Sequence, residues 1–191
     1  MWVLIGGPPG VGKSTLASGL AAAMKWSVLR SDEVRRNVID AGLNWHGTSE
    51  WLANHFSPEA TLVTYGELVH RARQLSDMGE SVVLDATWSS AALRALATRE
   101  AGEAHCACRS VRCDAPDDVA EERVARRIAA GSDISMATAD IARRIGAAFE
   151  PWPDAVAIST ITPVGDSLAA VAEALNSGDW TAREPVREGR S

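Results

Sequence analysis

The chain has 191 residues, of which 46% are hydrophobic and 23% are charged, a size and composition that suit one globular domain with a substantial core. Its formal net charge of −6 argues against a general nucleic-acid coat, because such proteins present a broad basic face, although a local basic groove is compatible with it. No apolar stretch approaches the roughly 20 residues that span a bilayer, and residues 1–24 lack a signal peptide's charged start and cleavage site, so a cytoplasmic protein is expected.

The first element is an apolar run at residues 2–5, which leads directly into a glycine-rich segment. From Gly7 this segment fits the P-loop pattern G-x-x-x-x-G-K-[ST] at every fixed position, and a helical pattern follows it. Glycines allow backbone N–H groups to approach phosphate oxygens closely, which is how a P-loop wraps a triphosphate. The residues predicted to bind the phosphates are Gly7, Pro8, Pro9, Gly10, Val11, Gly12, Lys13, Ser14 and Thr15.

Two of these side chains have further predicted roles. Lys13 should reach the β- and γ-phosphates of ATP, and the Ser14 hydroxyl should bind Mg²⁺. The helix that begins near Lys13 would turn its positive N-terminal end toward the anion. A plain turn rich in glycine and proline is the alternative, but the four fixed positions coincide by chance in only about one in a hundred chains of this size.

Strand-like and helical segments alternate along the rest of the chain. Helices are expected at about 13–24, 32–41, 58–78, 90–101, 114–130, 137–149 and 166–176. Strands are expected at about 2–5, 26–30, 81–85, 105–113 and 156–161, and residues 43–57 should form a loop or short helical pieces. This alternation predicts an α/β protein with the three-layer P-loop NTPase fold, a five-stranded parallel sheet and a helical lid, whose ligands bind at the carboxyl ends of the strands.

The expected organisation is one P-loop kinase domain over residues 1–176, with a lid at about 120–148 and a polar tail at 177–191. Because a phosphoryl-transfer site must exclude water, the lid is expected to close over bound substrates, with Gly131 as a plausible hinge. The cysteines, all between residues 106 and 113, lack the C-x-x-C spacing of a zinc site and should be small buried thiols on a strand.

A carboxylate, Asp85, ends the apolar strand predicted at 81–85. Taken alone, an acid in this position is more often a turn or cap residue. A triphosphate site, however, needs a second oxygen ligand for its cation besides the P-loop hydroxyl. We therefore expect Asp85 to act as a Walker B acid that holds Mg²⁺ together with Ser14.

The segment Ser31-Asp32-Glu33-Val34-Arg35 follows the second predicted strand. It could be a plain helix start with acids in the first turn. In a parallel sheet that carries a P-loop, however, Asp32 would face the phosphates, and Arg35 would share its helix face. The pair is then a candidate general base and phosphate clamp, because an aspartate can accept a hydroxyl proton while a guanidinium neutralises phosphoryl charge.

Arginines recur in the helix before residue 131. Arg123 lies on one helix face with Arg126 or Arg127, a spacing that could grip separate phosphate oxygens. A solvated face with Glu–Arg pairs is the competing interpretation. Arg143 and Arg144 are expected to have surface roles.

These motifs together resemble the small P-loop kinases grouped with the kinase domain of polynucleotide 5′-kinases and with zeta toxins, and among them predicted kinases with an AAA-type ATP-binding domain often fused to an aminoglycoside-phosphotransferase-like domain. The resemblance covers about residues 2–176 and rests on residues 7–15, Ser31-Asp32 with Arg35, residues 82–87 and residues 122–127. It implies that Asp32 is the general base, that Arg35 contacts substrate or phosphate, and that the arginine-bearing helix is a lid over ATP. Trp88 and Ser159 depart from the family's pattern, the first near the acceptor pocket.

Two functional hypotheses of different classes follow. The first is an ATP-dependent kinase that moves the γ-phosphate to a hydroxyl of a small-molecule or nucleotide-like acceptor, with Lys13, Arg35 and a lid arginine, Arg123 or Arg127, neutralising charge. The second is an ATP-binding switch that hydrolyses slowly and acts on a protein partner. Asp32 favours the kinase, since a switch needs a positioned water more than an acid that faces an acceptor.

The sequence leaves the acceptor open. Polynucleotide 5′ ends, sugars, aminoglycosides and nucleotide sugars all present a hydroxyl, and the acidic balance favours a small molecule. Irregularly spaced aromatic residues are more often packed in a core than placed in a pocket. The candidates for the pocket are Trp45, Trp51, His55, Phe56 and Trp88.

Overall fold

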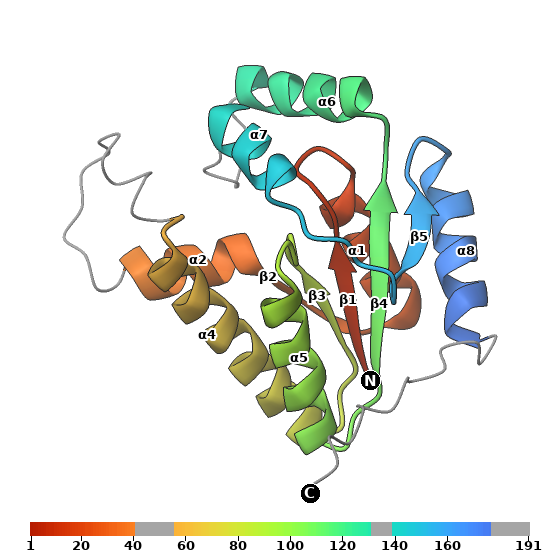
Figure 1. Cartoon of the computed structure of the whole chain (residues 1–191). Helices are drawn as coiled ribbons and strands as arrows, with labels where there is room; N and C mark the ends of the chain where they lie inside the picture. The colour runs from red at the N-terminus through yellow and green to blue at the C-terminus, as the bar shows by residue number, and fades with distance from the viewer. Residues whose placement is uncertain (41–55, 131–138, 177–191) are drawn as a thin grey trace, which may run out of the picture.

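The computed structural model describes residues 1–40, 56–130 and 139–176 and confirms the predicted three-layer P-loop NTPase fold (Figure 1). Its strands are β1 (Trp2–Gly6), β2 (Ser27–Arg30), β3 (Val82–Asp85), β4 (Cys108–Asp114) and β5 (Val156–Ser159). They form a five-stranded sheet in the order β2-β3-β1-β4-β5, and all neighbouring strands are parallel.

Helices cover both faces of this sheet. They are α1 (Lys13–Met24), α2 (Ser31–Asp40), α4 (Pro58–Asp77), α5 (Ala91–Glu103), α6 (Asp117–Ala130), α7 (Ala139–Ala147) and α8 (Val164–Asn176). α1 and α8 pack together on one face, while α2, α4 and α5 cover the other. Across the described residues, no helix combines the length and apolar character that crossing a membrane requires.

The central strand β1 divides the core between the two faces. All five of its residues are buried, and their side chains alternate between two hydrophobic clusters, as expected for a strand covered on both sides. Trp2 and Leu4 pack toward α4 and α5, whereas Val3 and Ile5 pack toward α1. The P-loop thus leaves the middle of the sheet from a fully buried strand.

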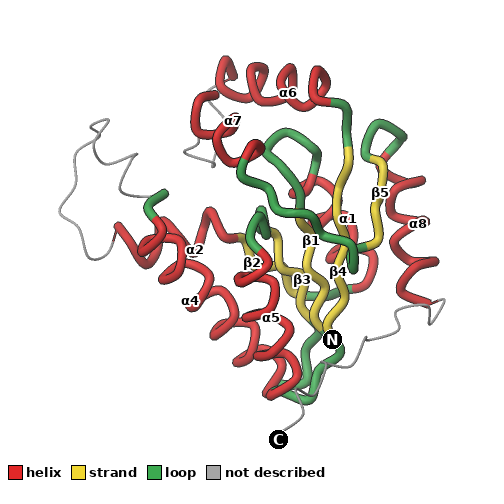
Figure 2. The backbone as a smooth tube through the Cα atoms, in the orientation of Figure 1, coloured by secondary structure: helices red, strands yellow, loops and turns green. Residues whose placement is uncertain are grey.

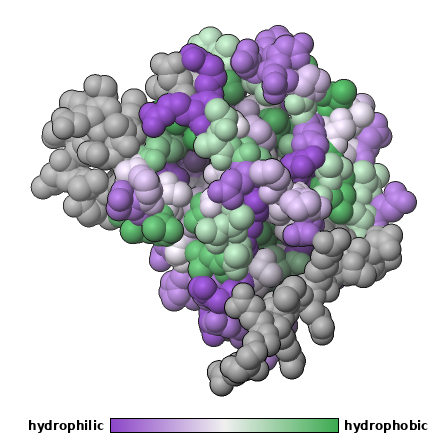
Figure 3. Space-filling model, viewed as in Figure 1, coloured by the Kyte–Doolittle hydropathy of each residue, from purple (hydrophilic) through white to green (hydrophobic). Residues whose placement is uncertain are grey.

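The strand register brings candidate site residues together at the carboxyl ends of the strands. Ile5 pairs with Asp85, which also pairs with Arg30 across β3 and β2. The carboxyl ends of three adjacent strands therefore meet beside the P-loop. α6 and α7 lie beyond these ends, at the top of the molecule in the view shown (Figure 2, and Figure 3 as a space-filling view).

The predicted element boundaries hold to within a few residues, with small shifts at the starts of elements. α2 begins at Ser31 directly after β2, and β4 begins at Cys108 because His105 adopts a left-handed turn conformation before it. Cys113 is buried on β4, and Cys106 and Cys108 are half-buried. The predictions for 43–55, 131–135 and 177–191 lie outside the described residues.

Candidate active site

The P-loop joins β1 to α1 in a conformation that requires glycine. Gly10 and Gly12 have φ angles of 85° and 91°, in the left-handed region. A Cβ at Gly10 would collide with the Ala120 carbonyl of α6. Gly12 is the N-cap of α1, no side chain caps this end, and the first turn holds no acidic residue. The uncapped N–H groups and the helix dipole fit the phosphates of a nucleotide.

Lys13 is folded back onto the loop that carries it. Its Nζ donates a hydrogen bond to the Pro8 carbonyl oxygen at 2.8 Å. Burial lowers the pKa of the Lys13 ammonium, while the nearby charges of Asp85 and Asp32 act to raise it. A buried ammonium with a single backbone acceptor is suited to exchange that acceptor for phosphate oxygens.

Asp85 lies across from Ser14 at the end of β3, and Asp85 is only 5% exposed to solvent. Burial raises the pKa of this carboxyl, whereas the Lys13 charge, a hydrogen bond from Ser14 and the Arg30 charge lower it. A hydroxyl and a carboxylate are both oxygen ligands of the kind that Mg²⁺ prefers. The two residues therefore fit the cation of a nucleotide–Mg²⁺ complex.

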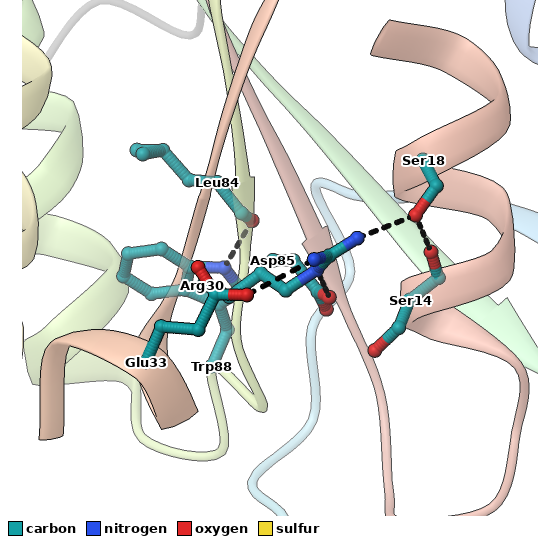
Figure 4. A network of polar contacts seen from close by, with 7 residues as sticks. All are labelled: Ser14, Ser18, Arg30, Glu33, Leu84, Asp85 and Trp88. Carbon is teal, nitrogen blue, oxygen red and sulfur yellow. Dashed lines mark hydrogen bonds and ion pairs between the residues drawn. The ribbon is translucent and has the colours of Figure 1, made fainter. Parts of the chain in front are cut away.

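Arg30, at the end of β2, connects this carboxylate to two helices (Figure 4). Its Nε lies 3.6 Å from Asp85 Oδ2, its Nη1 donates to Glu33 of α2 at 3.0 Å, and its Nη2 donates to Ser18 of α1 at 2.6 Å. The Ser18 hydroxyl in turn donates to the Ser14 carbonyl at 2.6 Å. Arg30 is not among the residues predicted from the sequence, although a basic residue directly before Ser31-Asp32 could have indicated it.

A cavity of about 860 Å³ opens beside the P-loop and brings most of the predicted site residues together. Those that line it are Pro9, Gly10, Lys13, Ser14, Asp32, Arg35, Asp85 and Arg127. Gly7, Pro8, Val11, Gly12, Thr15 and Arg123 are not among its lining residues.

Asp32 and Arg35 lie in the first turns of α2, and both line this cavity. Burial lowers the pKa of Arg35, and its guanidinium lies 4.8 Å from the centroid of the Phe56 ring. Tyr65 lines the same cavity, and its hydroxyl accepts a hydrogen bond from the Trp88 backbone N–H at 3.1 Å. Burial raises the pKa of Tyr65 to about 12, so its hydroxyl keeps its proton at neutral pH.

A second cavity, of about 530 Å³, lies on the other side of the P-loop. Gly12, Thr15, Arg123, Arg126 and Arg127 line it, together with the segment 160–164 that follows β5. Arg127 therefore borders both cavities.

Arg123 is engaged with the protein itself in this conformation. Its Nη2 donates to the Thr160 carbonyl at 2.9 Å, and its Nη1 lies 3.3 Å from Thr160 Oγ1 and 3.5 Å from the Gly10 carbonyl. Thr160 Oγ1 also donates to the Val11 carbonyl at 2.6 Å. Arg123 thus links α6 to the P-loop and to the end of β5, and its predicted contact with the γ-phosphate stays a prediction.

Comparison with known protein families shows to which family this chain belongs. The model of a protein family described as an AAA domain matches residues 2–152. The chain belongs to this AAA domain family. The matched stretch includes the P-loop, Asp32, Arg35, Asp85, Arg123 and Arg127.

Two curated relatives of this AAA domain come from mycobacteria. Uncharacterized protein Rv2004c of Mycobacterium tuberculosis and Uncharacterized protein Mb2027c of Mycobacterium bovis are each 37% identical to it over 160 residues. The match covers 84% of this chain and 32% of each relative, so the chain spans about a third of their length.

Solved kinase structures share the fold of this AAA domain. A sugar kinase from Janibacter sp. HTCC2649 superposes with a TM-score of 0.70 at 16% identity, covering 91% of this chain and 93% of that chain. The Mycobacterium tuberculosis APS kinase CysC in complex with AMPPNP and APS gives 0.67 at 23% identity, covering 91% and 96%. A gluconokinase from Sinorhizobium meliloti 1021 gives 0.60 at 16% identity, covering 91% and 94%. At these identities the likeness shows the fold alone, which is that of the P-loop kinases.

The aromatic candidates divide between the core and the cavity of the AAA domain. Trp88 is fully buried, donates from Nε1 to the Leu84 carbonyl at 3.2 Å and packs edge-on against Tyr65, so it belongs to the core. Phe56 lines the larger cavity. Trp45, Trp51 and His55 lie outside the described residues.

Proposed function

We propose that this AAA domain is an ATP-dependent phosphotransferase that moves the γ-phosphate of ATP to a hydroxyl of a small molecule. The observation that carries the proposal is that Asp32 and Arg35 line the same cavity as Lys13, Ser14 and Asp85. A site for hydrolysis alone has no need of an acid and a buried guanidinium across a cavity from the phosphate loop. An acceptor that enters this cavity would lie between Asp32 and the γ-phosphate.

In the proposed reaction, the phosphates bind to the P-loop and to the N-terminal end of α1. Lys13 and Arg127 would neutralise phosphate charge, while Ser14 and Asp85 would hold Mg²⁺. The cation, when bound, supplies further neutralisation of the phosphate oxygens. Asp32 accepts the proton of the acceptor hydroxyl as the hydroxyl oxygen bonds to the γ-phosphorus, and the bond from that phosphorus to the β,γ-bridging oxygen breaks to release ADP.

The proposed phosphotransferase also has a defined domain, lid and acceptor contact. The kinase domain comprises residues 1–176, α6 and α7 act as its lid, and Arg35 contacts the phosphoryl group or the acceptor. The resemblance to polynucleotide 5′-kinases and zeta toxins supports a hydroxyl acceptor, and a polynucleotide 5′ end stays among the candidates. A cytoplasmic location, with ATP and Mg²⁺ at hand, suits this activity.

Substitution of the proposed base tests the reaction type. In Asp32→Asn, transfer to an acceptor should fall by about a hundredfold or more, because general-base catalysis contributes roughly 10²–10⁴-fold, while ATP affinity should change little. The measurement is transfer of labelled phosphate together with equilibrium binding of a non-hydrolysable ATP analogue. Phosphate release that survives in Asp32→Asn, with no acceptor labelled by either protein, would favour the switch instead.

A further inference from the structure

The larger cavity continues from the P-loop into a second half that no phosphate role explains. We call this part the acceptor half and define it by Arg35, Phe56, Tyr65, Ile141, Arg144 and Ile145, all of which line the cavity. Its walls come from α2, from α4 with the residues just before it, and from α7. The acceptor half therefore joins apolar side chains to guanidinium groups from two separate elements.

One face of α7 forms the roof of the acceptor half. Ile141, Arg144 and Ile145 recur at spacings of three and four residues, so they share one side of the helix, and they line the cavity together with Ala148, the residue after the helix. Arg143, one position earlier, is exposed and is not among the lining residues. Arg144 is thus the charged member of an otherwise apolar or small-residue face that is turned to the cavity.

The guanidinium of Arg144 is available to a ligand. It makes neither a hydrogen bond nor an ion pair with another part of the described chain. Two other exposed arginines, Arg99 of α5 and Arg126 of α6, are held in ion pairs, Arg126 with Glu122 at 2.6 Å.

The charged side chains that line the cavity are mainly positive, although the chain as a whole is negatively charged. Among the described residues, five cationic side chains line it beside only two carboxylates, those of Asp32 and Asp85, in a protein of formal net charge −6. Arg30 is committed to Asp85 and Glu33, and Lys13 and Arg127 lie at the phosphate side. Arg35 and Arg144 are the cations of the acceptor half, and the charge of Asp32 lies near that of Arg35.

Arg35 supplies the buried part of this charge. Its residue is 5% exposed, and the Phe56 ring lies against one face of its guanidinium. Desolvation makes a buried guanidinium costly, and an additional anionic partner offsets that cost through charge-assisted hydrogen bonds. An anion in the acceptor half would meet Arg35 from α2 and Arg144 from α7.

We propose that the hydroxyl acceptor is a small anionic molecule whose carboxylate or phosphate group binds Arg35 and Arg144, while its carbon skeleton contacts Phe56, Ile141 and Ile145. This inference rests on the proposed phosphotransferase function and names the substrate class for it. The anionic group anchors the acceptor, and the hydroxyl is left to face Asp32.

The first experiment compares matched acceptors with the wild-type protein. The panel consists of three- to six-carbon sugar acids, the corresponding sugar phosphates and the corresponding neutral polyols, each tested for transfer from γ-labelled ATP. The expected result is a kcat/KM for a sugar acid or a sugar phosphate at least roughly tenfold above that of its neutral counterpart, the gain typical of a charge-assisted contact. The ratio between the acid and the phosphate shows which anionic group the acceptor half prefers.

The second experiment removes one charge at a time. Arg144→Gln should raise KM for the anionic acceptor roughly tenfold, leave KM for ATP nearly unchanged and reduce the preference over the neutral polyol. Arg143→Gln is the matched control, because its side chain is adjacent in sequence and does not line the cavity, and it should leave all three values close to those of the wild type.

The outcomes separate this inference from the proposed function. Transfer to neutral polyols without any preference for anions would overturn the anionic acceptor and leave the phosphotransferase intact. An equal loss with Arg144→Gln for charged and neutral acceptors would also overturn it. ATP hydrolysis with transfer to no member of the panel would count against the phosphotransferase itself, and the inference would fall with it.

Discussion

Lys13 is the residue on which nucleotide binding should depend most. Lys13→Ala removes the ammonium that faces the phosphates, so ATP affinity and turnover should both fall by roughly tenfold or more, in line with the loss of a hydrogen bond to a charged group. Calorimetry with ATP and a steady-state assay measure the two effects. Lys25→Asn is a suitable control, because Lys25 ends α1 on the surface in a left-handed conformation that asparagine tolerates. Equal affinities for Lys13→Ala and the wild type would contradict the P-loop assignment.

Arg30 should act as a positioning residue for Asp85. Arg30→Lys keeps the positive charge but loses the forked contacts to Ser18, Glu33 and Asp85, so the carboxylate is held less firmly. We expect the Mg²⁺ concentration for half-maximal activity to rise about threefold or more, with a smaller change in kcat at saturating Mg²⁺.

A matched control for Arg30 lies on α4. Arg71 pairs with Glu67 at 2.7 Å, far along the helix from the cavity, so Arg71→Lys should leave the Mg²⁺ requirement unchanged. A wild-type Mg²⁺ requirement in Arg30→Lys would show that Arg30 serves the packing of α2 alone.

At the scale of elements, α6 divides into a part that contacts the P-loop and a part that is exposed. Arg123 binds the P-loop carbonyl of Gly10 and Thr160, and Val124 is buried, whereas residues 125–130 are all exposed. Lid closure should therefore involve residues 125–130 and α7 rather than the start of α6.

Hydrogen exchange tests this division of the lid. With a non-hydrolysable ATP analogue and Mg²⁺, protection should increase in residues 125–130 and in α7, and change little in 117–123 and in α5. Uniform behaviour across the whole of α6, or no change in α7, would argue against a lid that moves beyond Arg123.

The elements also show what could be predicted from the sequence and what could not. The β1–P-loop–α1 unit was predictable because its phosphate-binding loop has fixed positions and its neighbours have distinct periodicities. Arg144 was expected to have a surface role, but it lines the cavity. The sequence could not show this, because the packing of α7 against distant segments decides which face of the helix points inward. Trp88 could not be assigned to the core from its position alone, since its burial depends on contacts with Tyr65 and with the region of Trp152 and Gly6.

For the whole molecule, stability should depend on the packing beneath the P-loop. A Cβ at Gly6 would collide with the Trp152 ring and come within 3.1 Å of Trp88, both in the core. Gly6→Ala should therefore lower the free energy of unfolding by about 1–3 kcal/mol, the usual cost of overpacking. Chemical denaturation measures this change.

Gly66 provides the opposite case within the same fold. It lies inside α4, and nothing is within 4 Å of the place where a Cβ would be. Gly66→Ala should raise the free energy of unfolding by about 0.5–1 kcal/mol through helix propensity. Destabilisation by both substitutions, to the same extent, would contradict the packing described around Gly6.

The central claim is that the γ-phosphate of ATP passes to an acceptor hydroxyl. The most direct measurement incubates the protein with γ-labelled ATP, Mg²⁺ and the acceptor panel, in parallel with Asp32→Asn, and separates labelled acceptor from inorganic phosphate. The account predicts a labelled phosphate ester that requires Mg²⁺ and is lost by about a hundredfold in Asp32→Asn. Label that appears only as inorganic phosphate, at equal rates in the two proteins, would contradict it.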